Sequence, residues 1–150
     1  IEKVEDKNVK GIFVMTASMK WLYSYYHDVI FLDSTCKTNK SDYPLVVIGG
    51  IDHNNKNIVL GFGFLRTEDN NSYKWFLSQL LKCTEGTEPG TILTDFDPAI
   101  AHAIEHTFKT TNHLLCEWHF MQNLKKQFIH LQNNKSASHK KIYDTILSLV

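Results

Sequence analysis

The sequence predicts a mixed α/β fold in which helices flank one five-stranded sheet. Three short apolar segments follow one another at residues 28–33, 45–51 and 58–65, which is typical of an antiparallel meander. Two further apolar segments, 91–95 and 111–116, alternate with helical patterns, as parallel strands joined by helix crossovers do. The 150 residues, 43% hydrophobic and 21% charged, suffice for one folded domain and argue against disorder.

The first 27 residues are expected to form a helical lead-in. Residues 1–10 are polar and show no period. Residues 12–26 carry apolar side chains at helical spacing, and a helix is predicted there. Its apolar positions are Phe13, Met15, Met19, Leu22 and Tyr26.

The meander begins with an interior strand. The segment DVIFLD at 28–33 is apolar on both faces, which favours a central position in the sheet. Residues 34–43 are polar and predict a loop. Pro44 opens the strand LVVIGGI, since proline fits the first position of a strand. The link DHNNKN at 52–57 is rich in turn residues and leads to IVLGFGFL at 58–65.

Helices and strands alternate after residue 68. Asn70 and Asn71 are N-cap candidates for a helix with a buried stripe over 73–81. TILTD at 91–95 is the fourth strand, and Asp97 with Pro98 caps and opens the next helix. TNHLLC at 111–116 is the fifth strand. A helical stripe over 120–131, a loop at 133–139 and a helix from residue 142 follow. The order βββαβαβα matches a ribonuclease H-like sheet.

Charge and cysteine content describe the kind of protein. Lys and Arg together number 16, and Asp and Glu together also number 16. Residues 120–150, however, hold five lysines and a single acidic residue, Asp144. An acidic body with a basic tail weakly suggests nucleic-acid binding. Three widely spaced cysteines indicate a reduced intracellular protein. The longest apolar run, 45–51, is too short to span a membrane, and a start at Ile1 suggests a segment of a longer chain.

Asp33 and Asp95 are the first candidate site residues, because each is predicted to close a central strand. The carboxyl ends of parallel strands meet at one edge of a sheet, where ligands of α/β folds bind. Two carboxylates there favour Mg²⁺ or Mn²⁺. The competing interpretation is that each aspartate is a turn or cap residue. Asp97 is a rival to Asp95, although its place before Pro98 favours capping.

Other polar residues near this edge leave alternatives open. His113, Cys116 and His119 suggest zinc, but residues 113 and 116 of a strand point to opposite faces. A Cys–His nucleophile pair and simple core packing of Cys116 are the other interpretations. Among further acids, Glu68 is expected to support a helix N-terminus, Glu105 to lie on a polar helix face and Glu117 to follow the fifth strand. Candidate phosphate contacts are Lys37, Lys40, Lys125 and Lys126.

These residues together resemble the transposase domain of Mutator-like elements (MULE). The resemblance rests on DVIFLDSTCKTNKSDYPLVVIGGID, LGFGFLRTEDNNSYKWFLSQL, TILTDFDPAIAHAIEHTF and HLLCEWHFMQNL, in this order over roughly residues 12 to 130. The combination of D-[ST]-T-x-K-T-N, Pro44-Leu45, the helix of Glu68 and Trp75, the T-D strand end and C-x-W-H is specific. Cys36 replaces the aromatic residue usual in this family.

The resemblance implies a ribonuclease H-like fold and the DDE transposase mechanism, with two Mg²⁺ or Mn²⁺ ions. It makes Asp33 and Asp95 the first two catalytic carboxylates, and Cys116 and His119 the C-x-x-H element beside them. The third acid is a glutamate after a helical insertion, yet no glutamate follows Glu117. The implied division is a lead-in at 1–27, a transposase core at 28–119 and the start of the insertion at 120–150.

The leading functional hypothesis is a DNA transposase core, truncated before its third acid, that cleaves element ends and transfers strands to target DNA. It implies a nuclear protein and is compatible with a homo-oligomer. The alternative is a domesticated, non-catalytic DNA-binding or transcription-regulatory protein. A nuclease for RNA–DNA hybrids is a third hypothesis, which the family resemblance disfavours.

Overall fold

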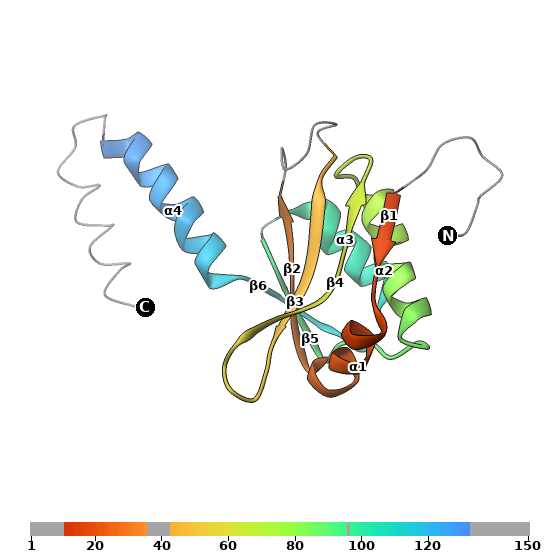
Figure 1. The fold of residues 1–150 in the computed structure, drawn as a ribbon. Coiled ribbons are helices and arrows are strands. Elements are labelled where there is room, and N and C mark those ends of the chain that lie inside the picture. Colours follow the sequence, from red (N-terminus) through yellow and green to blue (C-terminus); the bar gives the residue numbers. More distant parts are fainter. Residues whose placement is uncertain (1–10, 36–42, 96, 133–150) are drawn as a thin grey trace. The chain divides into compact units, whose positions relative to one another are not determined.

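The computed structural model describes residues 11–35, 43–95 and 97–132, with side chains through residue 126. The chain divides into two compact units, Ile1–Leu115 and Cys116–Val150. In its described part, the first unit contains a six-stranded sheet and three helices, and the second contains α4, Glu117–Gln132 (Figure 1). The loop predicted at 133–139 and the helix predicted from 142 lie outside the described residues, as do residues 1–10.

The sheet is mixed and has the strand order β1-β4-β3-β2-β5-β6. Its strands are β1 (Gly11–Val14), β2 (Val29–Thr35), β3 (Leu45–Ile51), β4 (Asn57–Leu65), β5 (Thr91–Thr94) and β6 (Asn112–Leu115). β2, β3 and β4 form the predicted antiparallel meander. β5 and β6 join it in parallel, β5 beside β2 and β6 beside β5. The meander and its two parallel additions are therefore confirmed.

The prediction of five strands is wrong, because the segment before α1 (Ala17–Tyr26) forms a sixth. Gly11–Val14 pairs with β4, with Ile12 opposite Phe64, and α1 begins only at Ala17. The Thr16 hydroxyl caps this helix by accepting from the Met19 N–H at 3.2 Å. Phe13 and Met15 fit the alternation of a strand as well as a helical stripe. The outer edge of β4 favours the strand over the helix, because pairing with β4 satisfies the backbone hydrogen-bonding groups of β1.

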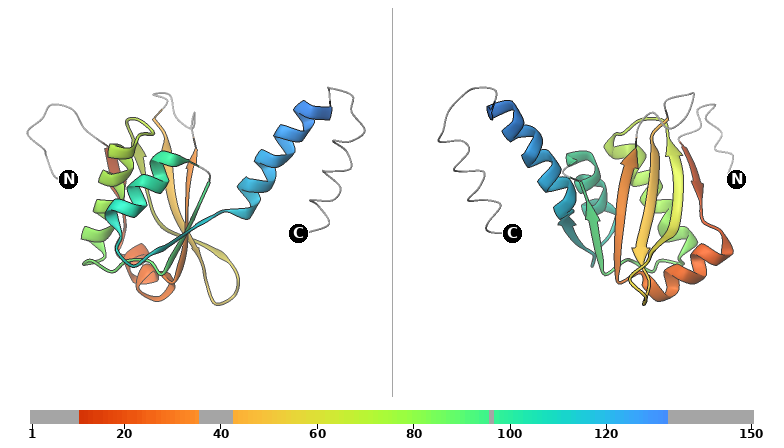
Figure 2. Two further views of the ribbon diagram at one scale, coloured as in Figure 1. Left: turned by 180° about the vertical axis from the view of Figure 1, so that it is seen from behind. Right: turned by 60° about the vertical axis from the view of Figure 1, so that its left-hand side comes forward.

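Helices α2 (Asn70–Cys83) and α3 (Pro98–Thr107) cover one face of the sheet (Figure 2). Asp69 caps α2 by accepting from the Ser72 N–H at 2.9 Å, so the expected caps Asn70 and Asn71 lie inside the helix. The core lies between these helices and the sheet. Its buried members include Ile30, Leu32, Val46, Ile48, Leu60 and Ile92 from the strands and Tyr73, Phe76, Leu77, Leu80, Ile100, Ala103 and Ile104 from the helices.

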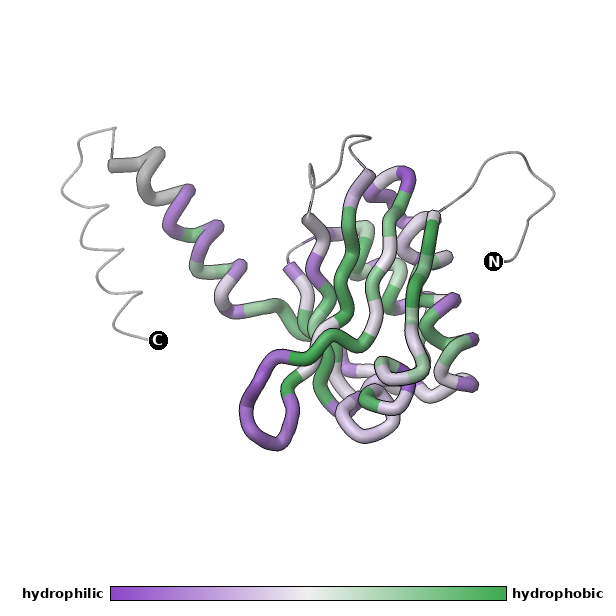
Figure 3. The backbone as a smooth tube through the Cα atoms, viewed as in Figure 1, coloured by the Kyte–Doolittle hydropathy of each residue, from purple (hydrophilic) through white to green (hydrophobic). Residues whose placement is uncertain are grey.

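The other face of the sheet carries exposed apolar side chains. Cross-strand partners share a face, and the register places Ile12, Val29, Val59 and Leu114 on the same face. Each of these four side chains is exposed. Asp33 lies on this face too, because strand residues two apart point the same way. The backbone coloured by hydropathy shows the contrast between these apolar strands and the hydrophilic β3–β4 turn (Figure 3).

The β3–β4 turn confirms the prediction for residues 52–57. Asp52 Oδ1 accepts from the backbone N–H groups of Asn54 and Lys56, at 2.8 and 2.9 Å. The Lys56 N–H bond is the main cause that lowers the pKa of this carboxyl. None of the described helices is long and apolar enough to cross a lipid bilayer.

Candidate functional site

Asp33 and Asp95 belong to neighbouring parallel segments and lie just beyond the last residues that β2 and β5 pair. β2 pairs with β5 up to Phe31 opposite Leu93. Asp33 and Asp95 each come two residues after their strand's member of this last pair. β2 continues to Thr35, so Asp33 lies within the strand and not at its last residue as predicted. Asp95 directly follows β5.

The two carboxylates differ in their surroundings. Asp33 is exposed on the open face of the sheet, whereas Asp95 is half-buried and its Oδ1 atom is shielded from solvent. Two carboxylates on adjacent strands repel each other unless a cation or a proton lies between them. Oxygen-only ligands of this kind suit Mg²⁺ or Mn²⁺ rather than softer metals. The donor set therefore fits the metal implied by the sequence.

A hydrogen-bonded group lies on the helix-covered face, next in sequence to Asp33. Ser34 donates its hydroxyl to Glu68 Oε1, and the Tyr73 hydroxyl approaches the same oxygen at 3.5 Å. This group was not predicted, because the sequence position of Glu68 indicated support of the helix N-terminus, which Asp69 caps. The available signal for this group was the position of Ser34, which directly follows the candidate site residue Asp33 in the sequence. The group ties β2 to α2 at the level of the carboxylate pair.

The Tyr73 hydroxyl stays protonated at neutral pH. Burial raises its pKa above the usual value, and the negative charges of Glu68, Asp97 and Asp95 raise it further, against a lowering by the hydrogen bond with Ser34. A phenol in this state is a hydrogen-bond donor without charge. It therefore meets the surrounding carboxylates without adding to their repulsion.

The end of β5 is held by His113 on β6. The buried Thr94 hydroxyl lies 2.8 Å from His113 Nε2 and also donates to the Asp95 carbonyl at 2.8 Å. Burial lowers the pKa of His113 below the usual 6.5, so the ring is neutral at pH 7. His113 was considered only as a zinc ligand in the sequence, but in the structure it supports the residue before Asp95.

The lowered pKa of His113 predicts a pH-dependent stability. The unfolded chain binds this proton more tightly than the folded one, so the contribution is fully present above pH 6.5 and decreases as the pH falls below it. We expect the urea midpoint of the wild type to fall more between pH 7.5 and pH 5.5 than that of His113→Gln. Equal falls in both proteins would contradict this role.

Asp97 is the cap of α3, as its position before Pro98 predicted. Its Oδ1 accepts from the Ala99 N–H at 2.6 Å, and Pro98 occupies the first turn. Capping uses one carboxylate oxygen at the helix N-terminus, where negative charge is favourable. Asp95 therefore remains the better partner for Asp33.

Cys116 and His119 belong to the second unit. Cys116 directly precedes α4 and His119 lies in its first turn, and both side chains are half-buried. The rings of His119 and Trp118 meet edge to face, with centroids 4.8 Å apart. The expected position of this C-x-x-H element beside Asp33 and Asp95 stays a prediction.

The other predicted site residues have varied surroundings. Lys125 and Lys126 are exposed on α4, and Glu117 is exposed in its first turn. Glu105 is exposed on α3, as its polar position predicted. The loop lysines, Lys37 and Lys40, lie outside the described residues.

Comparison with known proteins assigns the family. Residues 29–123 match the MULE transposase domain. The chain belongs to this family. The matched region runs from β2 into α4 and includes Asp33, Asp95, Cys116 and His119, so the resemblance seen in the sequence is confirmed at the level of the family.

Several relatives of this MULE domain come from Arabidopsis thaliana. Protein FAR1-RELATED SEQUENCE 6 is 30% identical over 145 residues, which cover 95% of this chain and 20% of the relative. Protein FAR1-RELATED SEQUENCE 5 is 25% identical over 131 residues, 87% of this chain and 17% of the relative. Protein FAR-RED IMPAIRED RESPONSE 1 is 25% identical over 87% of this chain and 16% of its own length. The chain spans a fifth or less of each relative.

Proposed function

We propose that this MULE domain is part of a transposase catalytic core with a ribonuclease H-like fold, in which Asp33 and Asp95 hold Mg²⁺ or Mn²⁺ for phosphodiester cleavage and strand transfer. The observation that carries the proposal is the parallel pairing of β2 with β5, after which each strand's carboxylate, Asp33 or Asp95, comes two residues beyond the last pair. The meander followed by two parallel crossover strands supports the fold assignment. The family match supports the reaction class.

Bound at this pair, two divalent ions supply Lewis-acid activation of a water or hydroxyl and charge stabilisation of the leaving oxygen. Asp33 faces solvent, so it is the carboxylate that substrate phosphates can approach. The Thr94 hydroxyl, which contacts His113 Nε2, donates a hydrogen bond to the Asp95 carbonyl and so positions Asp95. Glu68 is hydrogen-bonded to Ser34 on the helix-covered face, which makes it a poor third ligand. Among the residues that the structure describes, the proposal assigns no third carboxylate.

The alternative is a domesticated, non-catalytic protein that binds DNA or regulates transcription. The relative named FAR-RED IMPAIRED RESPONSE 1 favours it, because that name refers to a response and not to transposition. Both functions imply DNA as the partner and a nuclear location, and both are compatible with a homo-oligomer. They differ in whether the carboxylate pair is needed for chemistry.

Nicking of plasmid DNA by the full-length protein in Mn²⁺ separates the two functions. We expect nicking that requires the metal and falls at least about a hundredfold in Asp33→Asn and in Asp95→Asn, since each loses charge stabilisation of the transition state. Asp28→Asn, an exposed carboxylate at the other end of β2, should retain the activity. An inert wild type that still binds DNA would favour the regulatory alternative.

Exposed lysines of α4 are expected to contribute to DNA binding without sequence preference. Removing Lys125 and Lys126 together should reduce the slope of log K against log salt by about 1 for each lysine, because fewer counterions are released. Fluorescence anisotropy with a short duplex at several salt concentrations measures the slope. The double variant of Lys56 and Lys109, also exposed, is the charge-matched control. An equal loss in both double variants would contradict a specific role for α4.

A further inference from the structure

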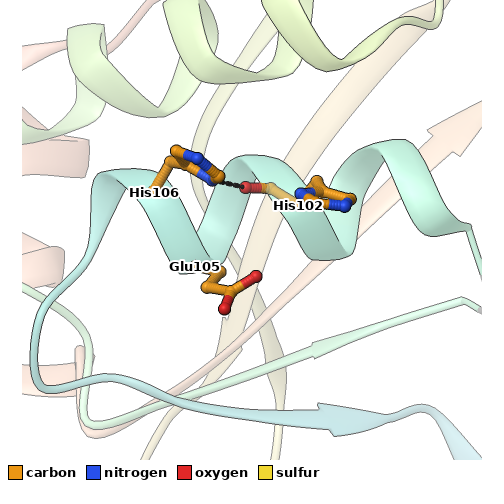
Figure 4. Close-up of side chains that lie close together, drawn as sticks. All are labelled: His102, Glu105 and His106. Atoms are coloured by element: carbon orange, nitrogen blue, oxygen red, sulfur yellow. Dashed lines mark hydrogen bonds between the residues drawn. The ribbon is translucent and has the colours of Figure 1, made fainter.

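Helix α3 presents a group of metal-binding side chains that the proposed reaction does not use. His102, Glu105 and His106 are all exposed, and one ligand atom from each lies within 4.8 Å of the others. Positions three and four apart lie on one side of a helix. Figure 4 shows the three side chains along the same stretch of α3.

The tautomer of His106 is set for metal binding. Its Nδ1 lies 2.9 Å from the His102 carbonyl oxygen, as drawn in Figure 4. A carbonyl can only accept, so Nδ1 carries a proton, and in the neutral ring the lone pair is then on Nε2. A ring N–H donated to a backbone carbonyl is the usual arrangement of a metal-bound histidine, because it fixes the ring and increases the basicity of the ligand atom.

The distances between the three ligand atoms are close to those of a metal site. Metal–ligand bonds of about 2.0–2.2 Å place the ligand atoms of a tetrahedral site about 3.3–3.6 Å apart. The three groups are already within 4.8 Å, and all three are exposed. Side-chain rotation alone can therefore bring them to one ion, without movement of the α3 backbone. Water would complete the coordination.

The ligand types select a different class of metal from the Asp33 and Asp95 pair. Two imidazoles and one carboxylate suit borderline ions such as Zn²⁺, Ni²⁺ or Cu²⁺, whereas Mg²⁺ prefers oxygen alone. The group begins five residues after the Asp97 cap, about 8 Å along the helix axis. It is thus a second location with its own donor set.

We propose that His102, Glu105 and His106 bind one borderline divalent transition-metal ion on the surface of α3, independently of the carboxylate pair. Such an ion joins consecutive turns of the helix. Because it binds the folded helix in preference to the unfolded chain, it raises the thermal midpoint of unfolding.

Nickel titration of the tag-free 150-residue protein tests this proposal. Calorimetry should show one Ni²⁺ per chain, and NMR should show paramagnetic broadening centred on residues 101–107. Affinity should fall about tenfold or more in His102→Gln and in His106→Gln, and less in Glu105→Gln. His53→Gln removes another exposed histidine and should leave binding unchanged.

Three results would overturn the proposal. The first is the absence of stoichiometric Ni²⁺ binding, and the second is binding that persists in both His102→Gln and His106→Gln. The third is binding that is lost in Asp33→Asn or Asp95→Asn, which would assign the ion to the carboxylate pair. Ni²⁺ binding that survives both aspartate substitutions and disappears with the two histidines supports a separate site, whether or not the protein is a transposase.

Discussion

Gly63→Ala is expected to destabilise the fold by about 1–3 kcal/mol, because the chains of β1 and β4 approach too closely to admit a side chain. A Cβ at Gly63 would lie 2.1 Å from the Ile12 carbonyl oxygen and 3.0 Å from the Phe76 ring. The nearest atom belongs to a backbone, so it cannot move away without loss of strand pairing. We expect a lower urea midpoint and weaker protection of the β1 amides from hydrogen exchange.

Gly61→Ala is the matched control on the same strand and the same face. A Cβ there meets its nearest neighbours at 3.6 Å, which is ordinary van der Waals contact. Its unfolding free energy should change little or increase by about 0.4–1 kcal/mol, since alanine restricts the unfolded chain. Equal destabilisation by both substitutions would show that the β1–β4 approach is not the cause.

Phe76→Ala is expected to cost about 3–5 kcal/mol, the range for removing a large aromatic from a core. Phe76 is fully buried on α2, and its ring meets that of Phe13 edge to face with centroids 5.0 Å apart. The substitution removes one of the contacts that join α2 to β1 and leaves a cavity beneath the sheet. Denaturant unfolding measures the loss directly.

The exposed Phe120 provides the comparison for Phe76. Its side chain is 51% exposed on α4, so Phe120→Ala should change the unfolding free energy by no more than about 0.5 kcal/mol. A loss at Phe76 as small as that at Phe120 would mean that the core does not lie between α2 and the sheet.

Much of the fold is predictable from local patterns in this sequence. The run LVVIGGI gave the bounds of β3, and Asp97 with Pro98 gave the start of α3, because each signal depends only on neighbouring residues. β1 was not predictable in this way. Whether Phe13 belongs to a strand or a helix depends on the free edge of β4, fifty residues further along the chain.

The candidate site shows the same division. The parallel pairing of β2 with β5, on which the predicted placement of Asp33 and Asp95 depends, follows from the rule for parallel crossovers and was predictable from the sequence. The hydrogen bond between Ser34 and Glu68 spans 34 positions of the sequence, and the one between Thr94 and His113 spans 19 positions. No local pattern specifies them, because they depend on how α2 and β6 pack against their neighbours.

Manganese titration of the ¹⁵N-labelled protein tests the carboxylate pair most directly. We expect paramagnetic broadening centred on the amides of residues 31–35 and 93–97, and weak affinity for the ion, because two carboxylates are a small ligand set for Mn²⁺. The broadening should be lost in Asp33→Asn and in Asp95→Asn and retained in Asp28→Asn. Broadening at these amides that is unchanged in both Asp33→Asn and Asp95→Asn, or no broadening there at all, would contradict the assignment of a metal site to Asp33 and Asp95.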